Sequence, residues 1–184
     1  MRPALVMSLL ALVPAVAGCG NRRTQPPDVI TPDAPQGTRE VRLKGVRFTA
    51  PFNWQDLPAL GLRAGGIQSN TATVAVWRYP RSEPLPASSA ALDEVEGLLV
   101  ERVKRRDATF ELRSSSTGRL AGARAIQLVG RQTIAGLPFG VRSAHVFAAG
   151  TEIVVDAYAR PQDFAALDAS VFRPLLRSLK LVRS

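Results

Sequence analysis

The chain has 184 residues, of which 46% are hydrophobic and 21% are charged, and its formal net charge is +9. This composition is typical of a globular protein and excludes an intrinsically disordered chain. A single cysteine excludes a disulfide framework and a cysteine-based structural zinc site, and a single histidine excludes a multi-histidine metal centre.

The N-terminal segment has the features of a bacterial export signal. Arg2 provides a basic start, residues 4–13 are apolar, and small residues precede Cys19. The tetrapeptide Val16-Ala17-Gly18-Cys19 resembles the lipobox of bacterial lipoproteins. This resemblance implies that residues 1–18 are removed as a signal peptide and that Cys19 becomes a lipidated N-terminus, which holds the chain on the extracytoplasmic face of the cell membrane or outer membrane. The alternatives are an ordinary secretory signal with a chance cysteine, or an N-terminal transmembrane anchor.

Residues 19–38 are predicted to form a tether between the lipid and a domain at 39–184. Four prolines break any helix there, and polar residues dominate the rest. A proline-rich segment favours an extended chain. The remaining residues are numerous enough to form one domain with its own hydrophobic core.

The positive charge of the chain restricts its partners. A basic surface suits anionic lipid head groups, polyanionic cell-wall polymers or acidic proteins. Nucleic acid is not an expected partner, since the chain is predicted to be exported and has no basic motif interleaved with aromatic residues. The alternative is that the arginines only solvate the surface.

The first part of the domain is predicted to form strands. Apolar and charged residues alternate over 41–48, with a bend at Gly45. A glycine-rich loop is expected over 61–66. A strand follows over 73–79, and a proline-rich loop over 80–86 separates it from the next element.

The segment 88–106 is predicted to be the longest helix. Leu92, Val95, Leu99 and Val103 recur at helical spacing and form one apolar stripe. Ser88 or Ser89 can cap its N-terminus. The basic residues 104–106 lie at its C-terminal end, where the helix dipole favours cations.

The second half is predicted to be rich in strands, followed by helix. The expected strands are 109–115, 123–132, 140–148 and 152–158, with a hairpin turn at Ala149-Gly150. Asp163 is expected to cap a short helix, and 171–181 to form one or two more helical turns. The predicted fold class is α+β, with an antiparallel sheet packed against a long central helix and a C-terminal helix.

Two parts of the chain resemble a known family. The stretch Gly45-Val46-Arg47-Phe48-Thr49-Ala50-Pro51, followed by Trp54, resembles the opening of PsbP-like domains, a fold shared with a Ran-binding Mog-type protein and many bacterial lipoproteins of unknown function. Tyr158, Phe164 and Phe172 are similar to the end of such domains. The resemblance covers residues 39–183. It implies a PsbP-like fold and an accessory or binding role, and it supplies no active site.

The predicted hairpin contains the ingredients of nucleophilic catalysis. If its turn has two residues, Ser143 faces Asp156 and His145 lies on the same face. A three-residue turn would instead place Arg142 opposite Asp156 as an ion pair. Glu152 shares a strand face with Asp156, as in a glycosidase carboxylate pair or simply a solvated strand side. Flat strands lack the sharp turn and oxyanion donors of a nucleophile, so we expect no enzyme and no catalytic residue, and a surface hydrolase is the least favoured function.

Two binding functions are favoured instead. In the first, the domain is an accessory module that docks on an envelope protein complex. In the second, a groove between sheet and helix carries or senses a lipid or small apolar ligand. The residues expected to form a ligand or partner surface are Trp54, Trp77, Tyr79, Phe139, Arg142 and His145. In the alternative, the aromatic residues fill the core. No cofactor or metal is expected.

Overall fold

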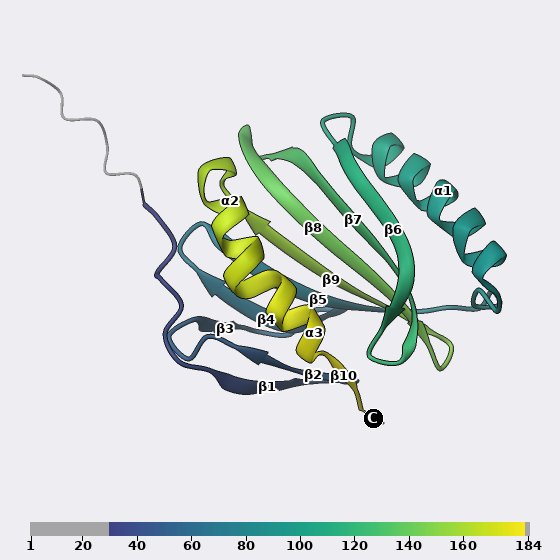
Figure 1. Ribbon diagram of the computed structural model, residues 1–184, viewed down its shortest axis with the longest axis horizontal. Coiled ribbons are helices and arrows are strands. Elements are labelled where there is room, and N and C mark those ends of the chain that lie inside the picture. Colours follow the sequence, from purple (N-terminus) through teal and green to yellow (C-terminus); the bar gives the residue numbers. More distant parts are fainter. Residues whose placement is uncertain (1–29, 183–184) are drawn as a thin grey trace, which may run out of the picture.

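The computed structural model describes residues 30–182, so the predicted signal peptide and Cys19 lie outside the described residues. The strands of a larger sheet are β3 (Gln55–Leu57), β4 (Arg63–Ser69), β5 (Ala72–Pro80), β6 (Glu111–Leu120), β7 (Ala123–Ile134), β8 (Leu137–Ala148) and β9 (Thr151–Ala159). Within the described residues, they form an antiparallel sheet in the order β3-β4-β5-β9-β8-β7-β6 (Figure 1). A smaller sheet, in the order β1-β2-β10, contains β1 (Arg39–Leu43), β2 (Val46–Ala50) and β10 (Lys180–Leu181).

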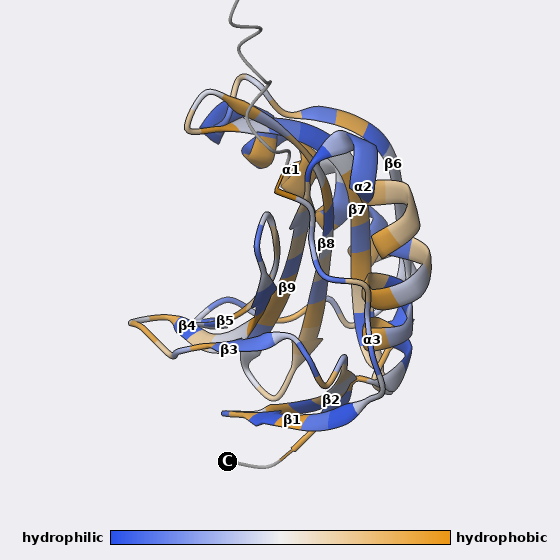
Figure 2. Cartoon of the chain, turned by 90° about the vertical axis from the view of Figure 1, so that its left-hand side faces the viewer, coloured by the Kyte–Doolittle hydropathy of each residue, from blue (hydrophilic) through white to orange (hydrophobic). Residues whose placement is uncertain are grey.

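Helices cover both faces of the larger sheet. On one face lies α1 (Ser89–Arg106). A continuous C-terminal helical segment, made of α2 (Pro161–Leu167), the π-helical turn η1 (Asp168–Phe172) and α3 (Arg173–Ser178), lies on the other. Figure 2 shows the sheet curved between them, with α1 near its upper end. The antiparallel α+β class is therefore confirmed.

Three successive hairpins of the larger sheet use the same turn. Ala121-Gly122, Ala135-Gly136 and Ala149-Gly150 each join two strands, and all six residues have positive φ. Positive φ at both central residues defines the type I′ turn, whose twist matches that of the flanking strands. The last of these turns pairs Ala148 with Thr151, so the hairpin has the two-residue turn rather than the three-residue alternative.

Alternation along β8 divides the interior into two apolar clusters. Ala144 and Val146 face the C-terminal helical segment and belong to the main core, together with Phe48, Trp54 and Phe172. Phe147 points to the opposite face. There it joins a second cluster with Leu92, Ile126 and Leu128, against which the apolar stripe of α1 packs. This period of two follows from the pleat of the strand.

The helix α1 has the bounds that the sequence predicts, but not the predicted central place. Ser88 is its N-cap, and the Ser88 hydroxyl accepts a hydrogen bond of 3.0 Å from the backbone N–H of Ala91. The helix contacts β6 and β7, at one edge of the sheet (Figure 1). The prediction of a long central helix is therefore not confirmed, and α1 overhangs the sheet from its edge.

The glycine-rich segment predicted as a loop is largely strand β4. Gly66 lies directly against β5, and a Cβ at this position would come within 2.0 Å of the Val74 carbonyl oxygen. Glycine is therefore required by close backbone approach and not by a turn. The prediction was wrong because glycines that permit close strand contact have the same sequence signature as loop glycines.

The C-terminal region differs from the prediction at both ends. Asp163 is not the cap of α2, because Pro161 already occupies the first turn and Arg160 is the N-cap residue. At the other end, Lys180 and Leu181 leave the helix and pair with β2. Two residues are too few to show a strand period, so this edge strand has no signal in the sequence.

Residues 30–38, which the sequence assigned to the tether, are attached to the domain. Ser69 accepts a 2.9 Å hydrogen bond from the backbone N–H of Asp33 and donates one of 2.9 Å to its carboxylate. The Trp54 indole N–H donates to the Asp33 carbonyl at 3.3 Å, and Asn53 contacts both Ala34 and Gln36. The folded unit therefore begins before residue 39, and these contacts shorten the predicted tether.

Candidate functional site

A cavity of about 470 Å³ lies between α1 and the larger sheet. Its volume is within the range of about 300–1,000 Å³ that is usual for small-molecule sites. The residues that line it come from α1, from β5, β7, β8 and β9, and from the loops that precede and follow α1. Elements far apart in the sequence thus converge on one concave surface.

The wall formed by α1 is mostly apolar. Val95, Leu98, Leu99 and Val103 point into the cavity, because they share one face of the helix. Leu98 remains 46% exposed, which places it at the mouth. Phe110 and Leu128 continue this apolar surface beyond the helix. An apolar ligand would meet hydrocarbon along this side.

The floor of the cavity contains a polar cluster among apolar residues, because β8 and β9 direct alternate side chains of both kinds into it. Ser143 and Asp156 are opposite each other in the strand register. The Ser143 hydroxyl donates a hydrogen bond of 2.6 Å to Asp156, and its oxygen lies 3.1 Å from Nε2 of His145. The two-residue turn therefore brings together the three polar residues that the sequence analysis grouped.

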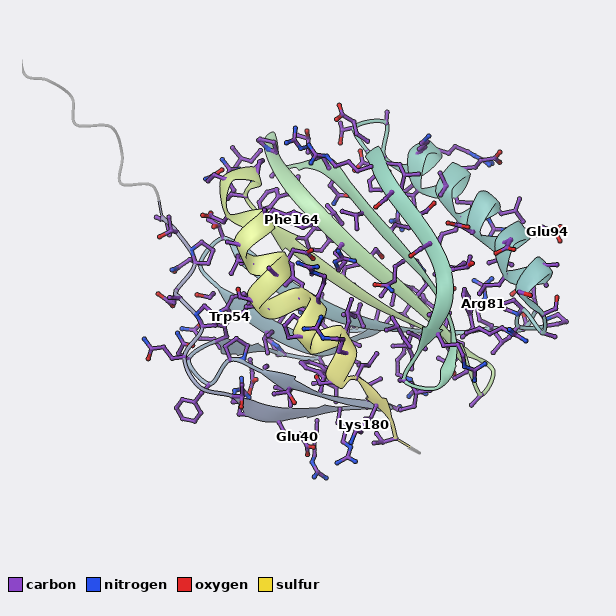
Figure 3. The ribbon with its side chains drawn as sticks, in the orientation of Figure 1. Glu40, Trp54, Arg81, Glu94, Phe164 and Lys180 are labelled. Carbon is purple, nitrogen blue, oxygen red and sulfur yellow. The ribbon has the colours of Figure 1, made fainter. Side chains whose placement is uncertain are left out.

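The hydrogen-bonded chain continues to an arginine outside the hairpin. Nδ1 of His145 lies 2.7 Å from Oε1 of Glu152, and Oε2 of Glu152 lies 3.1 Å from the Arg81 guanidinium. Ser143, His145 and Glu152 are all buried. Figure 3 places Arg81 at the end of the sheet near α1, far from Trp54. The sequence analysis missed Arg81, since nothing in the proline-rich loop marks it as a partner of β9.

Burial and hydrogen bonding shift the two carboxyl groups in opposite directions. Burial raises the pKa of Asp156, although the Ser143 hydrogen bond and the charge of His145 act against this shift. Burial also acts to raise the pKa of Glu152, but the hydrogen bond and charge of His145, with the charge of Arg81, lower it overall. The neighbours of these two acids therefore shift their pKa values in opposite directions, although both acids belong to one strand.

Two tyrosines beside Asp156 are held in their neutral form. Burial and the nearby Asp156 carboxylate raise the pKa values of Tyr158 and Tyr79. Both tyrosines line the cavity. Their hydroxyls are consequently neutral hydrogen-bonding groups on its floor.

The arrangement of Ser143, His145 and Glu152 follows the order of a catalytic triad, but its protons are placed differently. A serine hydroxyl has one proton, and the 2.6 Å contact directs it to Asp156. With its proton directed to Asp156, the serine presents its oxygen, and not its proton, to Nε2 of His145. β8 is also paired on both sides, with β7 and β9, so its backbone amides are engaged in the sheet and are not oxyanion donors.

The residues predicted as a ligand or partner surface are dispersed. Tyr79 and His145 line the cavity. Trp77 does not line it, although its β9 partner Val154 does. Trp54 is 2% exposed and belongs to the main core, so the alternative that it fills the core applies to it. Sequence reasoning did not separate these residues because aromatic side chains suit both a core and a ligand site.

Arg142 and Phe139 are also outside the cavity. Arg142 faces the opposite side of the sheet, where its guanidinium forms a two-pronged ion pair with Asp168 of η1, and it does not pair with Asp156. The guanidinium of Arg160 lies 5.4 Å from the centre of the Phe139 ring. Arg142 therefore contacts the C-terminal helical segment, and Phe139 contacts Arg160, the residue that precedes this segment.

Two arginines of α1, Arg102 and Arg106, line the cavity from the helix. They are four residues apart and so share one helical face. Both are exposed to solvent. Among the ion pairs of residues 30–182, none involves either guanidinium. Sequence reasoning explained the basic end of α1 by the helix dipole and missed this role.

No group of three or more His, Cys, Asp or Glu side chains in the described part of the chain could hold a metal ion. Among the helices between residues 30 and 182, none has both the length and the apolar character needed to cross a bilayer.

No family model matches the chain, and no curated protein matches it in sequence. Solved structures do match. Cyanobacterial PsbP (CyanoP) from Synechocystis has a TM-score of 0.60 and 13% identity, over 81% of this chain and 95% of that one. LpqN, involved in cell envelope biogenesis of Mycobacterium tuberculosis, has a TM-score of 0.57 and 17% identity, over 80% and 91%.

A Pseudomonas aeruginosa protein of unknown function, PA94, matches with a TM-score of 0.50 and 18% identity, over 80% of this chain and 97% of that chain. The domain therefore has a PsbP-like fold, as the resemblance implied. Identities this low show the fold alone, because one fold supports many unrelated functions.

Proposed function

We propose that this chain is a lipid-anchored accessory protein of the cell envelope that binds a small ligand in the cavity under α1, and that it is not an enzyme. The observation that carries this proposal is the cavity itself, with its apolar helix wall and polar floor. Such a combination is typical of ligand sites, where apolar surface supplies affinity and a few polar groups supply orientation. Membership of the envelope is supported by the export signal and by the shared fold with LpqN.

Mass spectrometry under native conditions tests ligand binding. The full chain, extracted from the membranes of cells that produce it, is expected to carry an additional small-molecule mass. Leu98→Trp should remove that mass, because residue 98 lies at the cavity mouth and can enlarge without displacing buried groups. Leu62→Trp is the matched control, since Leu62 is also exposed but lies outside the cavity. A protein that carries no ligand would contradict the proposal.

The absence of catalysis is supported by the placement of the Ser143 proton. A serine that donates to Asp156 is not activated by His145, and activation requires the histidine to receive that proton. We expect no hydrolysis of p-nitrophenyl decanoate that depends on Ser143, and no labelling of Ser143 by a fluorophosphonate. Hydrolysis that disappears in Ser143→Ala would show that the chain is an enzyme.

The anchor is tested separately. Cys19→Ala should prevent acylation and cleavage after residue 18, so that the variant keeps the mass of the full chain, because the proposed attachment is through the cysteine sulfur. If the variant remains in the membrane fraction at its normal mass, the lipid anchor is wrong. Crosslinking in intact cells examines the accessory role, and recovery of the monomer alone would count against a protein partner.

A further inference from the structure

We propose that the ligand of this cavity is a single-chain amphiphile with an anionic head group, which Arg102 and Arg106 bind while its hydrocarbon chain lies along α1. This inference rests on the proposed binding function and adds to it the chemical class of the ligand. It follows from the positions and the balance of the charges at the cavity.

The two guanidinium groups lie beside the apolar wall of the cavity. Arg102 and Arg106 continue the cavity-facing row of Leu98, Leu99 and Val103 along the same helix. Their side chains therefore border the same space as the apolar wall. A molecule with its hydrocarbon on that wall would bring its head group to the arginines, provided that it lies along the helix axis.

Most of the other charged groups around the cavity are paired within the protein. Arg81 is paired with both Glu83 and Glu152, at 3.5 and 3.1 Å, and Glu152 also contacts His145. These charges are satisfied within the protein. Asp156 is hydrogen-bonded to Ser143 and lies where burial disfavours its charge. The positive charges without an ion-pair partner, among the described residues that line the cavity, are Arg102 and Arg106.

The chemistry of the guanidinium group favours an anionic head group. Its planar array of donors matches the oxygens of carboxylates and phosphates, and two such groups one helical turn apart can share one anion. A cationic head group would be repelled at the same place. A neutral head group would bind to the apolar wall without using either arginine. The geometry thus favours anionic amphiphiles over neutral and cationic ones of equal chain length.

Calorimetric titration with a matched series of probes tests this inference. The protein is the chain from residue 19 onward with Cys19→Ser, which leaves all described residues unchanged and carries no acyl group of its own. The probes are decanoate, decyl phosphate, decanol and decyltrimethylammonium, each below its micelle concentration. We expect an anionic probe to bind about tenfold or more tightly than decanol, because hydrogen bonds to charged groups are the stronger ones. The two anionic probes distinguish a carboxylate from a phosphate head.

The variant Arg102→Gln/Arg106→Gln should bind decanoate no more tightly than decanol. Lys104→Gln/Arg105→Gln is the control, since it also removes two positive charges from the same helix but at positions outside the cavity lining. Equal affinity for decanoate and decanol, or equal loss in the control, would overturn the inference and leave ligand binding in place. Failure of the proposed function has a different signature, because no probe would then bind and Leu98→Trp would change nothing.

Discussion

Ser143 on β8 and Asp156 on β9 face each other directly in the strand register, and the serine hydroxyl donates to the carboxylate at 2.6 Å. This one contact decides how the polar floor of the cavity behaves. It commits the serine proton to Asp156, although His145 stands 3.1 Å away on the other side of the serine oxygen. The floor consequently contains polar groups that hydrogen bonds hold in fixed orientations.

The stability of Asp156→Asn, relative to that of the native chain, should increase as the pH rises. Burial raises the pKa of Asp156 above its ordinary value of 3.8, so the folded state holds this proton more tightly than the unfolded state does. The stability that this group provides is complete below its unfolded pKa and is lost as pH rises through its folded pKa. Asparagine is neutral throughout.

Urea unfolding of both proteins between pH 4 and pH 8 measures this effect. The free energy of unfolding of the variant, relative to the native chain, should increase with pH above about 4. Parallel curves for the two proteins would show that Asp156 does not titrate differently on folding.

Glu152→Gln should show the opposite dependence on pH. Despite burial, the contacts with His145 and Arg81 lower the pKa of Glu152 below its ordinary value of 4.5. Its contribution to stability is present above that value and is lost as the pH falls through the lower folded pKa. We expect the variant to lose about 1–3 kcal/mol at pH 7, because buried hydrogen-bonding groups are left without their charged partner. The loss should diminish in acid, and a loss that persists unchanged at pH 3 would refute this account of Glu152.

Gly66→Ala should destabilise the domain strongly. The added Cβ would lie 2.0 Å from the Val74 carbonyl oxygen, so the pairing of β4 and β5 has to open. Overpacking of this kind costs typically about 1–3 kcal/mol, and more where backbone must move. Gly118→Ala on β6 is the matched control, since a Cβ there meets nothing within 4 Å. Thermal unfolding compares the two, and equal melting temperatures would contradict the described strand contact.

The strand pattern was largely predictable, because apolar alternation and turn residues are local signals. The three Ala-Gly pairs are themselves turn signals in the sequence. For Ala149-Gly150, that signal was compatible with two strand registers. Register decided whether Ser143 or Arg142 would meet Asp156. Only pairing across the whole sheet, which places apolar Ala144 and Val146 in the main core, selects between them.

The partners of the cavity could not be predicted in the same way. Arg81 contacts Glu152 across 71 positions of sequence, and Arg102 and Arg106 border the cavity only because α1 lies over the edge of the sheet. Such contacts depend on how the elements pack in three dimensions, and helical or strand periodicity in the sequence carries no information about that. The docking of residues 30–38 could not be predicted for the same reason. A proline-rich composition indicates an extended chain but does not indicate the surface on which that chain lies.

Ser69→Ala should loosen residues 30–38 without unfolding the domain. The Ser69 hydroxyl holds both the backbone N–H and the carboxylate of Asp33, and loss of a typical hydrogen bond amounts to about 1 kcal/mol. Amide exchange at Asp33 should accelerate about fivefold. Ser116→Ala, at an exposed site on β6, serves for comparison and should leave this exchange unaltered. Unchanged exchange in Ser69→Ala would mean that the segment is held by other contacts.

The most direct test of the binding site is to locate a bound ligand by NMR. Decanoate should shift the amide signals of the α1 residues 95–106 and of the cavity-facing positions of β8 and β9, in the chain from residue 19 with Cys19→Ser. A second hollow, of about 520 Å³, lies at the turn end of the β8–β9 hairpin, beside Gly45 and Leu181 and without any residue of α1. Shifts confined to α1, β8 and β9 would establish the cavity as the site. Shifts centred on Gly45 and Leu181, or none at saturating decanoate, would contradict it.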